Sequence, residues 1–364
     1  MKLKNAFSLI AVCLVALSFT FCKKPTVVNP LISDSNEVPL LPEKPVDYPA
    51  SQNDYLAALG RVLFYDKDLS SNKNIACGSC HQQEHAFCDN LQFSPGTNNL
   101  HTKRNTPSIF ARNSRLFWDG RSNSLQDLVF RPVRDKVEMN TQDVPLLIDR
   151  IARTDYYVHL FPYAFPNAKK IDSSMIKMAL AEFLKNFNFS NSKFKMSQQG
   201  AAFLSESETL GKTLFFGKAK CSQCHHVEND KFASNTGGYG STNESHNIGL
   251  DVTNSDLGVG AISHNAKDEG AFMMPVLLNI EFTSPYMHDG RFKTLEEVVD
   301  HYDSGIKNNP NLDFILRSTN GTGGAPQQLN LSAAEKKSLV DFLKTLSDPT
   351  VLTDVNYSNP FVPR

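Results

Sequence analysis

The chain has 364 residues, which is long enough for two domains that each bury their own core. Lys and Arg together number 37 against 38 for Asp and Glu, so the formal net charge is −1. This balance gives no electrostatic basis for nucleic acid as a partner. The function must therefore be sought in local motifs.

The first residues have the features of an export signal. Lys2 and Lys4 precede an apolar run over residues 6–21. The run has the length and basic flank of a secretory signal peptide rather than of a membrane span. We therefore predict a signal peptide over residues 1–22 and a protein of the bacterial periplasm.

The segment after this signal predicts an attachment to the membrane. Cys22 resembles the lipidated cysteine of bacterial lipoproteins, although Phe21 stands where a small residue is usual. Simple cleavage of the signal is the alternative. Residues 23–50 are rich in proline and predict an extended tether.

Two copies of a Cys-x-x-Cys-His motif dominate the chain. They comprise Cys77, Cys80 and His81 in the first copy, and Cys221, Cys224 and His225 in the second. This motif is the attachment signature of c-type haem, in which both cysteines bond the porphyrin and the histidine binds the iron. A zinc site or a pair of disulfides would not explain why both copies end in histidine. We therefore predict two covalently bound haems.

Other segments are also present twice. The sequence LGRVLFY at residues 59–65 precedes the first motif, and LGKTLFF at residues 210–216 precedes the second. The tetrapeptide WDGR at residues 118–121 and its counterpart HDGR at residues 288–291 are 170 positions apart. The chain therefore reads as two diverged copies of one haem domain.

The helical patterns agree with this division. Apolar residues spaced over 176–187 predict a helix that closes the first copy, and Ser205 with Glu208 and Ser332 with Glu335 form candidate capping boxes of two more helices. No regular alternation of strands is apparent. We predict a mainly α fold of two cytochrome c-like haem domains with long loops, over residues 51–197 and 198–348, followed by a tail over 349–364.

The repeat contains one informative difference. Thr294 and Glu297 form a capping box for a predicted helix on which Tyr302 shares one face with Leu295, Val298 and Val299, while His301 points away. The offset of 170 places Pro132 opposite Tyr302, and proline cannot bind iron. One haem would then have two protein ligands and the other an open face, which an iron needs to bind a small molecule. The alternative, that Tyr302 is an ordinary core residue, stays open.

Together these motifs resemble the bacterial dihaem cytochrome c peroxidases and the related enzyme MauG, which oxidises a protein substrate. The resemblance spans roughly residues 51–346. It rests on both haem motifs and on Ala86-Phe87, RNTPS at 104–108, FWDGR at 117–121, VEM at 137–139, TSPYMHDGRF at 283–292 and TLEEVVDHY at 294–302.

The resemblance implies a role for each matching residue. His81 would be the sole protein ligand of the peroxide-binding haem, and His225 would bind the haem that receives electrons. Glu138 would be the catalytic acid–base group, as cleavage of the O–O bond requires. Trp118 would relay electrons between the haems. Calcium would be bound between the domains by oxygen donors, a preference of this hard cation, from Asn105, Thr283 and Pro285.

The chain also departs from the family pattern. The peroxidases typically have methionine at the position of Tyr302, whereas MauG has tyrosine, so Tyr302 suggests a second haem of lower potential. Met287 and Met274 are competing candidates for this ligand. Leu128 stands where many relatives have glutamine.

The first haem is expected to be open without an activating switch. Many peroxidases close it with a histidine from the loop after the first motif, and neither His85 nor His101 stands at a matching position. Cys88 belongs to neither haem motif and is expected to be a small buried residue.

These observations lead to three hypotheses. The first is a peroxidase that reduces hydrogen peroxide with electrons from a cytochrome c or a copper protein, and that forms a homodimer as such peroxidases commonly do. The second is a MauG-like enzyme that oxidises a protein partner. The third is a dihaem electron carrier with both irons closed, against which Pro132 and Glu138 argue.

Overall fold

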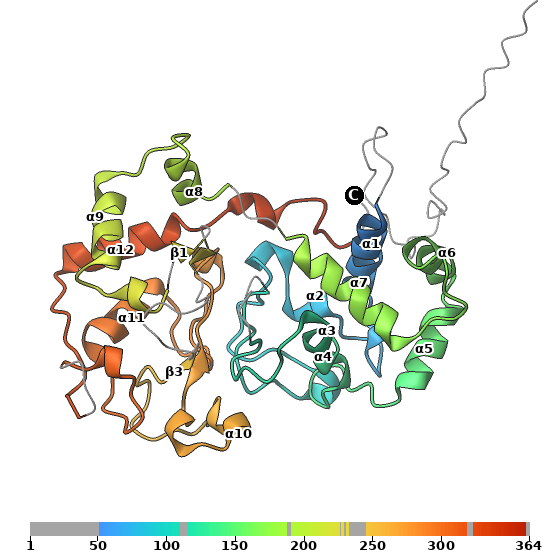
Figure 1. Ribbon diagram of the computed structural model, residues 1–364, viewed down its shortest axis with the longest axis horizontal. Helices are drawn as coiled ribbons and strands as arrows, with labels where there is room; N and C mark the ends of the chain where they lie inside the picture. Colours follow the sequence, from blue (N-terminus) through green and yellow to red (C-terminus); the bar gives the residue numbers. More distant parts are fainter. Residues whose placement is uncertain are drawn as a thin grey trace, which may run out of the picture.

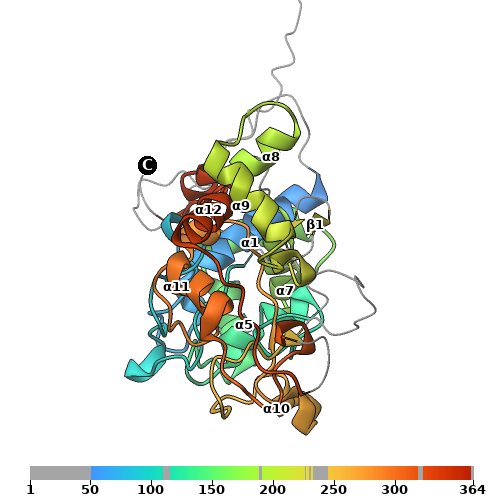
Figure 2. The ribbon, with the colours of Figure 1, turned by 90° about the vertical axis from the view of Figure 1, so that its left-hand side faces the viewer.

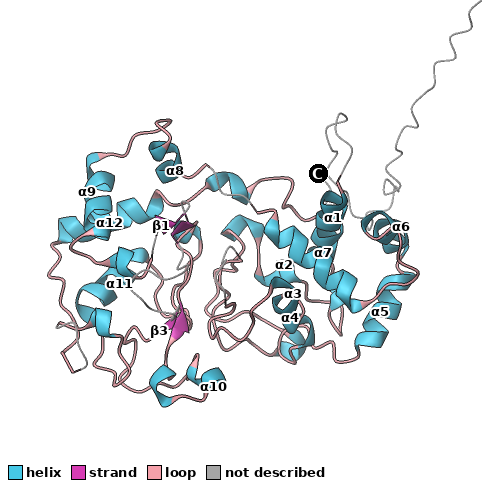
Figure 3. Cartoon of the chain, viewed as in Figure 1, coloured by secondary structure: helices cyan, strands magenta, loops and turns pink. Residues whose placement is uncertain are grey.

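The computed structural model describes residues 51–109, 115–187, 191–225, 227–228, 231–232, 245–318 and 323–361. The predicted signal peptide, Cys22 and the tether lie outside these ranges. Two helix-rich lobes stand side by side and are connected by loops, as Figures 1 and 3 show. No described helix is long and apolar enough to cross a membrane. The predicted mainly helical fold is confirmed.

The first lobe is built on the contact between two helices. α1 (Gln52–Tyr65) packs along α7 (Ser173–Lys185), and Gly60 lets them approach, because a Cβ there would meet the carbonyl group of Ala179. The shorter helices surround this pair. They are α2 (Cys77–Cys80), α3 (Leu125–Leu128), α4 (Arg131–Arg134), α5 (Val144–Arg153) and α6 (Asp155–Ala164).

The second lobe repeats this construction. α9 (Glu206–Phe216) packs along α12 (Ala333–Lys344), and a Cβ on Gly211 would meet the carbonyl group of Ser338. Figure 2 views the molecule from the left-hand side of Figure 1 and shows these two helices beside each other. The remaining helices are α8 (Lys193–Gln198), α10 (Gly260–Ser263) and α11 (Leu295–Asp300).

Strands are few and short. β1 (Val227–Glu228) pairs antiparallel with β2 (Lys231–Phe232). β3 (Ser245–His246) pairs antiparallel with β4 (Phe272–Met273), with His246 opposite Phe272. The second pair lies at the boundary between the lobes, because the Met273 N–H donates to the Trp118 carbonyl oxygen over 2.8 Å.

Two segments cross from one lobe to the other. Phe194 in α8 belongs to the apolar core of the second lobe, although it precedes the predicted boundary at residue 198. The C-terminal segment returns to the first lobe, where the Tyr357 ring stacks on Phe187 with 4.4 Å between centroids and Val351 is buried in the core. The C-terminal segment is thus part of the first core, while the domain limits stay a prediction.

The capping boxes at Ser205, Thr294 and Ser332 are confirmed, and each precedes a helix. The helix after Thr294 is shorter than expected. α11 ends at Asp300 and a π-helical turn, His301–Gly305, follows. Leu295 and Val299 join the main core of the second lobe, whereas Tyr302 packs against a separate cluster formed by Ile306, Leu312 and Leu316. The prediction of a regular α-helix through Tyr302 is therefore wrong, because a wider turn follows α11, but Leu295, Val298 and Tyr302 still line the same cavity.

Candidate active site

A cavity of about 1140 Å³ lies between the lobes, and both Cys-x-x-Cys-His motifs line it. Its wall includes Cys77, Cys80 and His81 of the first lobe and Cys221, Cys224 and His225 of the second. The two motifs are more than a hundred positions apart in the sequence, yet they line the same cavity.

The first motif is presented by a single helical turn. α2 begins at Cys77, and the Ser79 hydroxyl accepts the Ala76 N–H over 3.0 Å. Burial raises the pKa of the Cys77 and Cys80 thiols to about 12. Neither cysteine is in a disulfide and both line the cavity, so both sulfurs are available for covalent attachment of a porphyrin.

The His81 ring is oriented by a backbone group. Its Nδ1–H donates to the Phe87 carbonyl oxygen over 2.8 Å, which leaves Nε2 as the free lone pair. A second hydrogen bond of this kind fixes the tautomer and direction of a metal-binding histidine. Burial also lowers the pKa of His81, which favours the neutral imidazole that a metal requires. The donor set therefore fits an iron porphyrin.

The second motif has a comparable environment. It starts in a 3₁₀ turn, Cys221–Gln223, that follows Lys220 in the left-handed conformation at φ +57°. Burial raises the pKa of the Cys221 and Cys224 thiols to about 12, as in the first lobe. The two motifs thus offer the same chemistry to the cavity.

The cavity wall near the first motif includes an acid group whose pKa is shifted toward neutrality. Glu138 is half-buried there, and burial followed by the negative charge of Asp135 raises its pKa to about 7. Pro132 and Leu128 line the same part of the cavity, whereas His85 and His101 do not belong to its wall. A carboxyl group with a pKa near neutrality can both accept and return a proton.

Three candidate ligands for the second iron line the cavity, namely Tyr302, Met287 and Met274. Burial raises the pKa of Tyr302, and the nearby thiols Cys224 and Cys221 add to this effect. Tyr302 therefore lies beside the second motif. His301 does not compete, because its Nε2–H donates to the Ile248 carbonyl oxygen over 3.0 Å.

The fold also brings together on this wall a histidine and an aspartate that no sequence motif indicates. His246 in β3 lines the cavity, and its Nδ1 lies 2.6 Å from Asp313 Oδ2. The other oxygen of Asp313 accepts the Ile315 N–H over 2.9 Å, and the partnership with His246 lowers the Asp313 pKa. The two residues are 67 positions apart, so only the fold reveals the pair.

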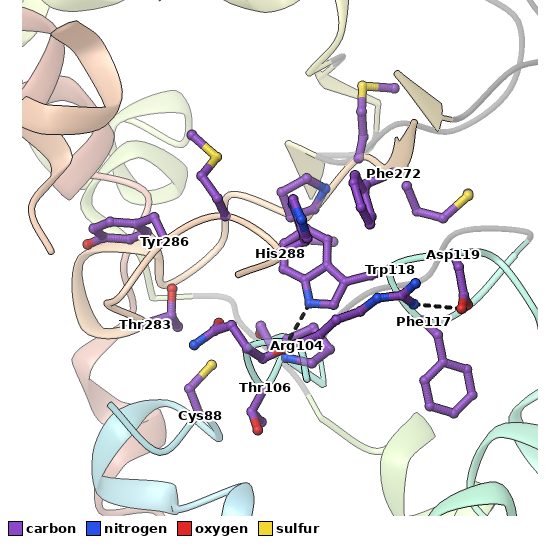
Figure 4. A pocket seen from close by; sticks show the side chains of 18 of the residues that line it. Cys88, Arg104, Thr106, Phe117, Trp118, Asp119, Phe272, Thr283, Tyr286 and His288 are labelled. Carbon is purple, nitrogen blue, oxygen red and sulfur yellow. Dashed lines mark hydrogen bonds and ion pairs between the residues drawn. The ribbon is translucent and has the colours of Figure 1, made fainter. Parts of the chain in front are cut away.

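Trp118 occupies the boundary between the lobes, as Figure 4 shows. Its indole Nε1–H donates to the Asn105 carbonyl oxygen over 2.9 Å, and its own carbonyl accepts the Met273 N–H. The Asn105 N–H in turn donates to the His288 carbonyl oxygen over 2.8 Å. Trp118 is thus held by backbone groups of both lobes.

Arg104 connects the lobes through ion pairs with one aspartate of each lobe. Its Nε and Nη2 donate to the two carboxylate oxygens of Asp256 over 2.7 and 2.8 Å, and its Nη1 donates to Asp119 Oδ2 over 2.6 Å. The Asp119 contact is drawn in Figure 4. These charge-assisted hydrogen bonds fix the turn that carries Trp118 relative to the second lobe.

The residues predicted to bind calcium line the cavity between the lobes. Asn105, Thr283 and Pro285 all line the cavity, and Thr283 lies near Trp118 and His288 in Figure 4. The Asn105 amide donates to the Leu91 carbonyl oxygen over 2.8 Å, so its Oδ1 remains the available donor to a cation. Amide and carbonyl oxygens suit calcium.

The comparisons with known proteins agree with this geometry. The sequence profile of the family described as di-haem cytochrome c peroxidase matches residues 54–202. The protein MauG of Methylorubrum extorquens is 30% identical, with 93% of this chain and 87% of that protein covered. The chain belongs to the dihaem cytochrome c peroxidase and MauG family.

Further relatives include both branches of this family. A cytochrome-c peroxidase, IdrP2, of a Pseudomonas species is 29% identical over 83% of this chain and 84% of its own length. The crystal structure of a MauG-like protein associated with microbial copper homeostasis is 32% identical, with a TM-score of 0.73 over 89% of this chain and 97% of that one. The protein is therefore a peroxidase-type oxidoreductase, and its family implies two c-type haems.

Proposed function

We propose that the protein reduces hydrogen peroxide to water with two electrons supplied by a small redox protein, a cytochrome c or a copper protein. The observation that carries this proposal is the single cavity on which both haem motifs, Glu138 and Trp118 open. Two electrons and two protons convert one hydrogen peroxide into two waters, so both electrons and protons must reach the bound peroxide.

The first site handles the proton. Cys77 and Cys80 would attach a haem with His81 as the iron ligand, and haem iron supplies peroxide binding and electron exchange. Glu138 takes the proton from one oxygen of hydrogen peroxide on its carboxylate and returns it to the other oxygen, which leaves as water. Its pKa of about 7 suits both steps.

The second site handles electrons. Cys221 and Cys224 would attach the second haem, with His225 and Tyr302 as iron ligands. Trp118 stands between the lobes and relays electrons from this site to the first. Its position is fixed by the hydrogen bond to Asn105 and by the ion pairs of Arg104. A calcium ion bound by Asn105, Thr283 and Pro285 would add to this connection.

The proposal extends to the organisation of the chain. The two lobes would be diverged copies of one haem domain, over residues 51–197 and 198–348, and the paired helices around Gly60 and Gly211 support this. Export to the periplasm by residues 1–22, lipid attachment at Cys22 and a homodimer complete the hypothesis. c-type haem is attached outside the bacterial cytoplasm, which supports export.

Electron paramagnetic resonance of the ferric protein tests the assignment of the two sites. We expect one high-spin signal from the open iron and one low-spin signal, and Tyr302→Phe should alter only the low-spin signal. Tyr163→Phe, at a half-exposed position remote from the cavity, is the matched control. A low-spin signal that responds to Met287→Leu or Met274→Leu instead would refute the Tyr302 assignment.

Steady-state turnover separates the peroxidase from its alternative. Reduced cytochrome c should be oxidised on addition of peroxide, and loss of this activity in Glu138→Gln would support the proposal. Two low-spin signals in the ferric protein, with no binding of cyanide, would refute an open first site.

A second function is favoured by Tyr302. Tyrosine stands where the peroxidases typically have methionine, and two of the relatives above are MauG and a MauG-like protein. A MauG-like enzyme would use peroxide to oxidise residues of a partner protein. Negligible turnover with cytochrome c, together with a long-lived oxidised state after addition of peroxide, would establish this alternative.

A further inference from the structure

A second cavity adjoins the first on the outer side of Glu138. We call it the outer chamber; its volume is about 470 Å³ and it lies among α3, α4 and α7. Its lining comprises Arg121, Asp127, Phe130, Arg131, Arg134, Asp135, Glu138 and Lys177. Three of these residues, Arg121, Asp135 and Glu138, also line the large cavity, so they form the wall between the two spaces.

This wall is built from fixed parts. The Arg121 guanidinium lies 3.7 Å from the centroid of the Phe117 ring, and its Nη1 donates to Asp119 over 2.9 and 3.0 Å. Asp135 Oδ1 accepts the N–H groups of Val137 and Glu138 over 2.8 and 3.2 Å. The Glu138 backbone is therefore held by Asp135, and the Arg121 guanidinium is held between Phe117 and Asp119.

The outer side of the chamber faces solvent. Arg131, Arg134 and Asp135 are exposed. Arg131 is paired with Asp127 over 2.7 Å, and Lys177 lies 4.7 Å from the centroid of the Phe130 ring. Arg134 and Lys177 form no ion pair with another described residue. The chamber is thus open and slightly cationic, which suits small polar or anionic molecules.

We propose that the outer chamber is the route by which hydrogen peroxide reaches the first haem site, with Arg121, Asp135 and Glu138 as its inner gate. A small molecule that passes this wall meets Glu138 first, which is the group that must handle its proton. The inference rests on the proposed function, because it needs an open first iron. It adds that Arg134 and Lys177 control access without any part in the chemistry.

Ligand association measures access directly. We would mix the ferric protein with hydrogen cyanide, which is neutral at neutral pH, in a stopped-flow instrument and record the Soret absorbance. Arg134→Trp places a large ring over an exposed position of the chamber. We expect on the order of a tenfold slower association and an unchanged equilibrium constant, because dissociation uses the same route. Arg153→Trp, at an exposed arginine on α5 outside both cavities, is the matched control.

A charge variant tests the same route without added bulk. Arg134→Glu should slow the association of azide, an anion, by roughly threefold at low salt, and the difference should vanish near 1 M salt, where screening is nearly complete. Association of neutral hydrogen cyanide should not change. Lys177→Trp provides a second blocking variant if Arg134→Trp fails to fold.

The outcomes separate this inference from the proposed function. Unchanged association rates in folded Arg134→Trp and Lys177→Trp would show that the ligand enters elsewhere, while the peroxidase proposal would stand. A wild-type ferric protein that binds no cyanide would instead refute the open first site, and the access route would fall with it.

Discussion

The two Cys-x-x-Cys-His sites have the same local frame and different surroundings. Each lobe rests on a pair of helices that touch at a glycine, Gly60 in one and Gly211 in the other. The first site faces Pro132, Leu128 and Glu138, whereas the second faces Tyr302 and the His246–Asp313 pair. The shared helix pairs therefore support the two attachment motifs, and the side chains opposite each motif decide the chemistry of that site.

The two Asp-Gly-Arg turns make the same point. Phe117 and Met287 have φ of +67° and +75°, Gly120 and Gly290 have φ of +65° and +62°, and each arginine pairs with the aspartate of its own turn. In the first turn Trp118 precedes the aspartate and donates to Asn105; in the second, His288 stacks on Phe272 with 3.7 Å between centroids. The same turn conformation thus positions an indole ring, Trp118, in the first lobe and an imidazole ring, His288, in the second.

The largest expected effect comes from removal of one attachment site. Cys77→Ala with Cys80→Ala should leave one of two covalent haems and abolish peroxide turnover, because the site that binds peroxide is lost. Cys221→Ala with Cys224→Ala should also leave one haem, but ferric cyanide binding should persist at the first site. The haem content of the denatured protein and cyanide titration measure both results.

Cys88→Ala is the control for these variants. Cys88 is buried and lines the cavity, but it belongs to neither motif. Both haems should remain attached in this variant. If instead Cys77→Ala with Cys80→Ala keeps full turnover, the assignment of the peroxide-binding site to the first lobe is wrong.

The next effect concerns the proton. Glu138→Gln should reduce kcat by about 10²- to 10⁴-fold, the usual contribution of general acid–base catalysis. Only the carboxylate can accept the first proton, so kcat/KM of the wild type should rise as pH passes through about 7 and then level off. The variant should lose this dependence. An unchanged pH profile in the variant would assign the proton transfer to another group.

The same pKa shift affects stability. Burial raises the pKa of Glu138 from 4.5 to about 7, so the folded state favours the protonated carboxyl group. The contribution of this group to stability is fully present below pH 4.5 and is lost as pH rises through about 7. Denaturant titrations of Glu138→Gln should therefore show a smaller decline in the free energy of unfolding over this range than the wild type.

Substitution of Gly60 and Gly211 tests whether the two lobes depend equally on a close contact between two helices. Gly60→Ala would place a Cβ against the Ala179 carbonyl group, and Gly211→Ala would place one against Ser338. Each substitution should lower the free energy of unfolding by about 1–3 kcal/mol, as overpacking usually does. Gly305→Ala, where φ is not left-handed and a Cβ would meet atoms only at ordinary van der Waals distances of 3.4 Å or more, is a control for added bulk. If only one of the two substitutions lowers the free energy of unfolding, the two helix pairs are not packed equally closely.

The helix starts and the two haem motifs could be predicted because they depend on local sequence. The capping boxes at Ser205, Thr294 and Ser332 are four-residue patterns whose hydrogen bonds form within one turn, and each was correctly predicted. The two haem motifs were likewise found from spacing alone. Such features need no knowledge of the distant chain.

The remaining features depend on contacts between distant segments. His246 and Asp313 become a pair only when β3 meets the loop before residue 314, and Arg104 reaches Asp256 across 152 positions. The π-helical turn at Tyr302 also escaped prediction, because an α-helical period was assumed for the whole segment. The family resemblance, rather than periodicity, brought Glu138 to attention.

The smallest expected effect concerns Leu128, which lines the cavity at a position where the family resemblance implies glutamine. Leu128→Gln would supply an amide that can hydrogen-bond the bound peroxide. One such bond contributes roughly 0.5–1.5 kcal/mol, so kcat/KM should rise by about two- to tenfold. Leu128→Met, which keeps the size without the amide, is the matched control. Equal rates in both variants would show that an amide at this position does not hydrogen-bond the peroxide.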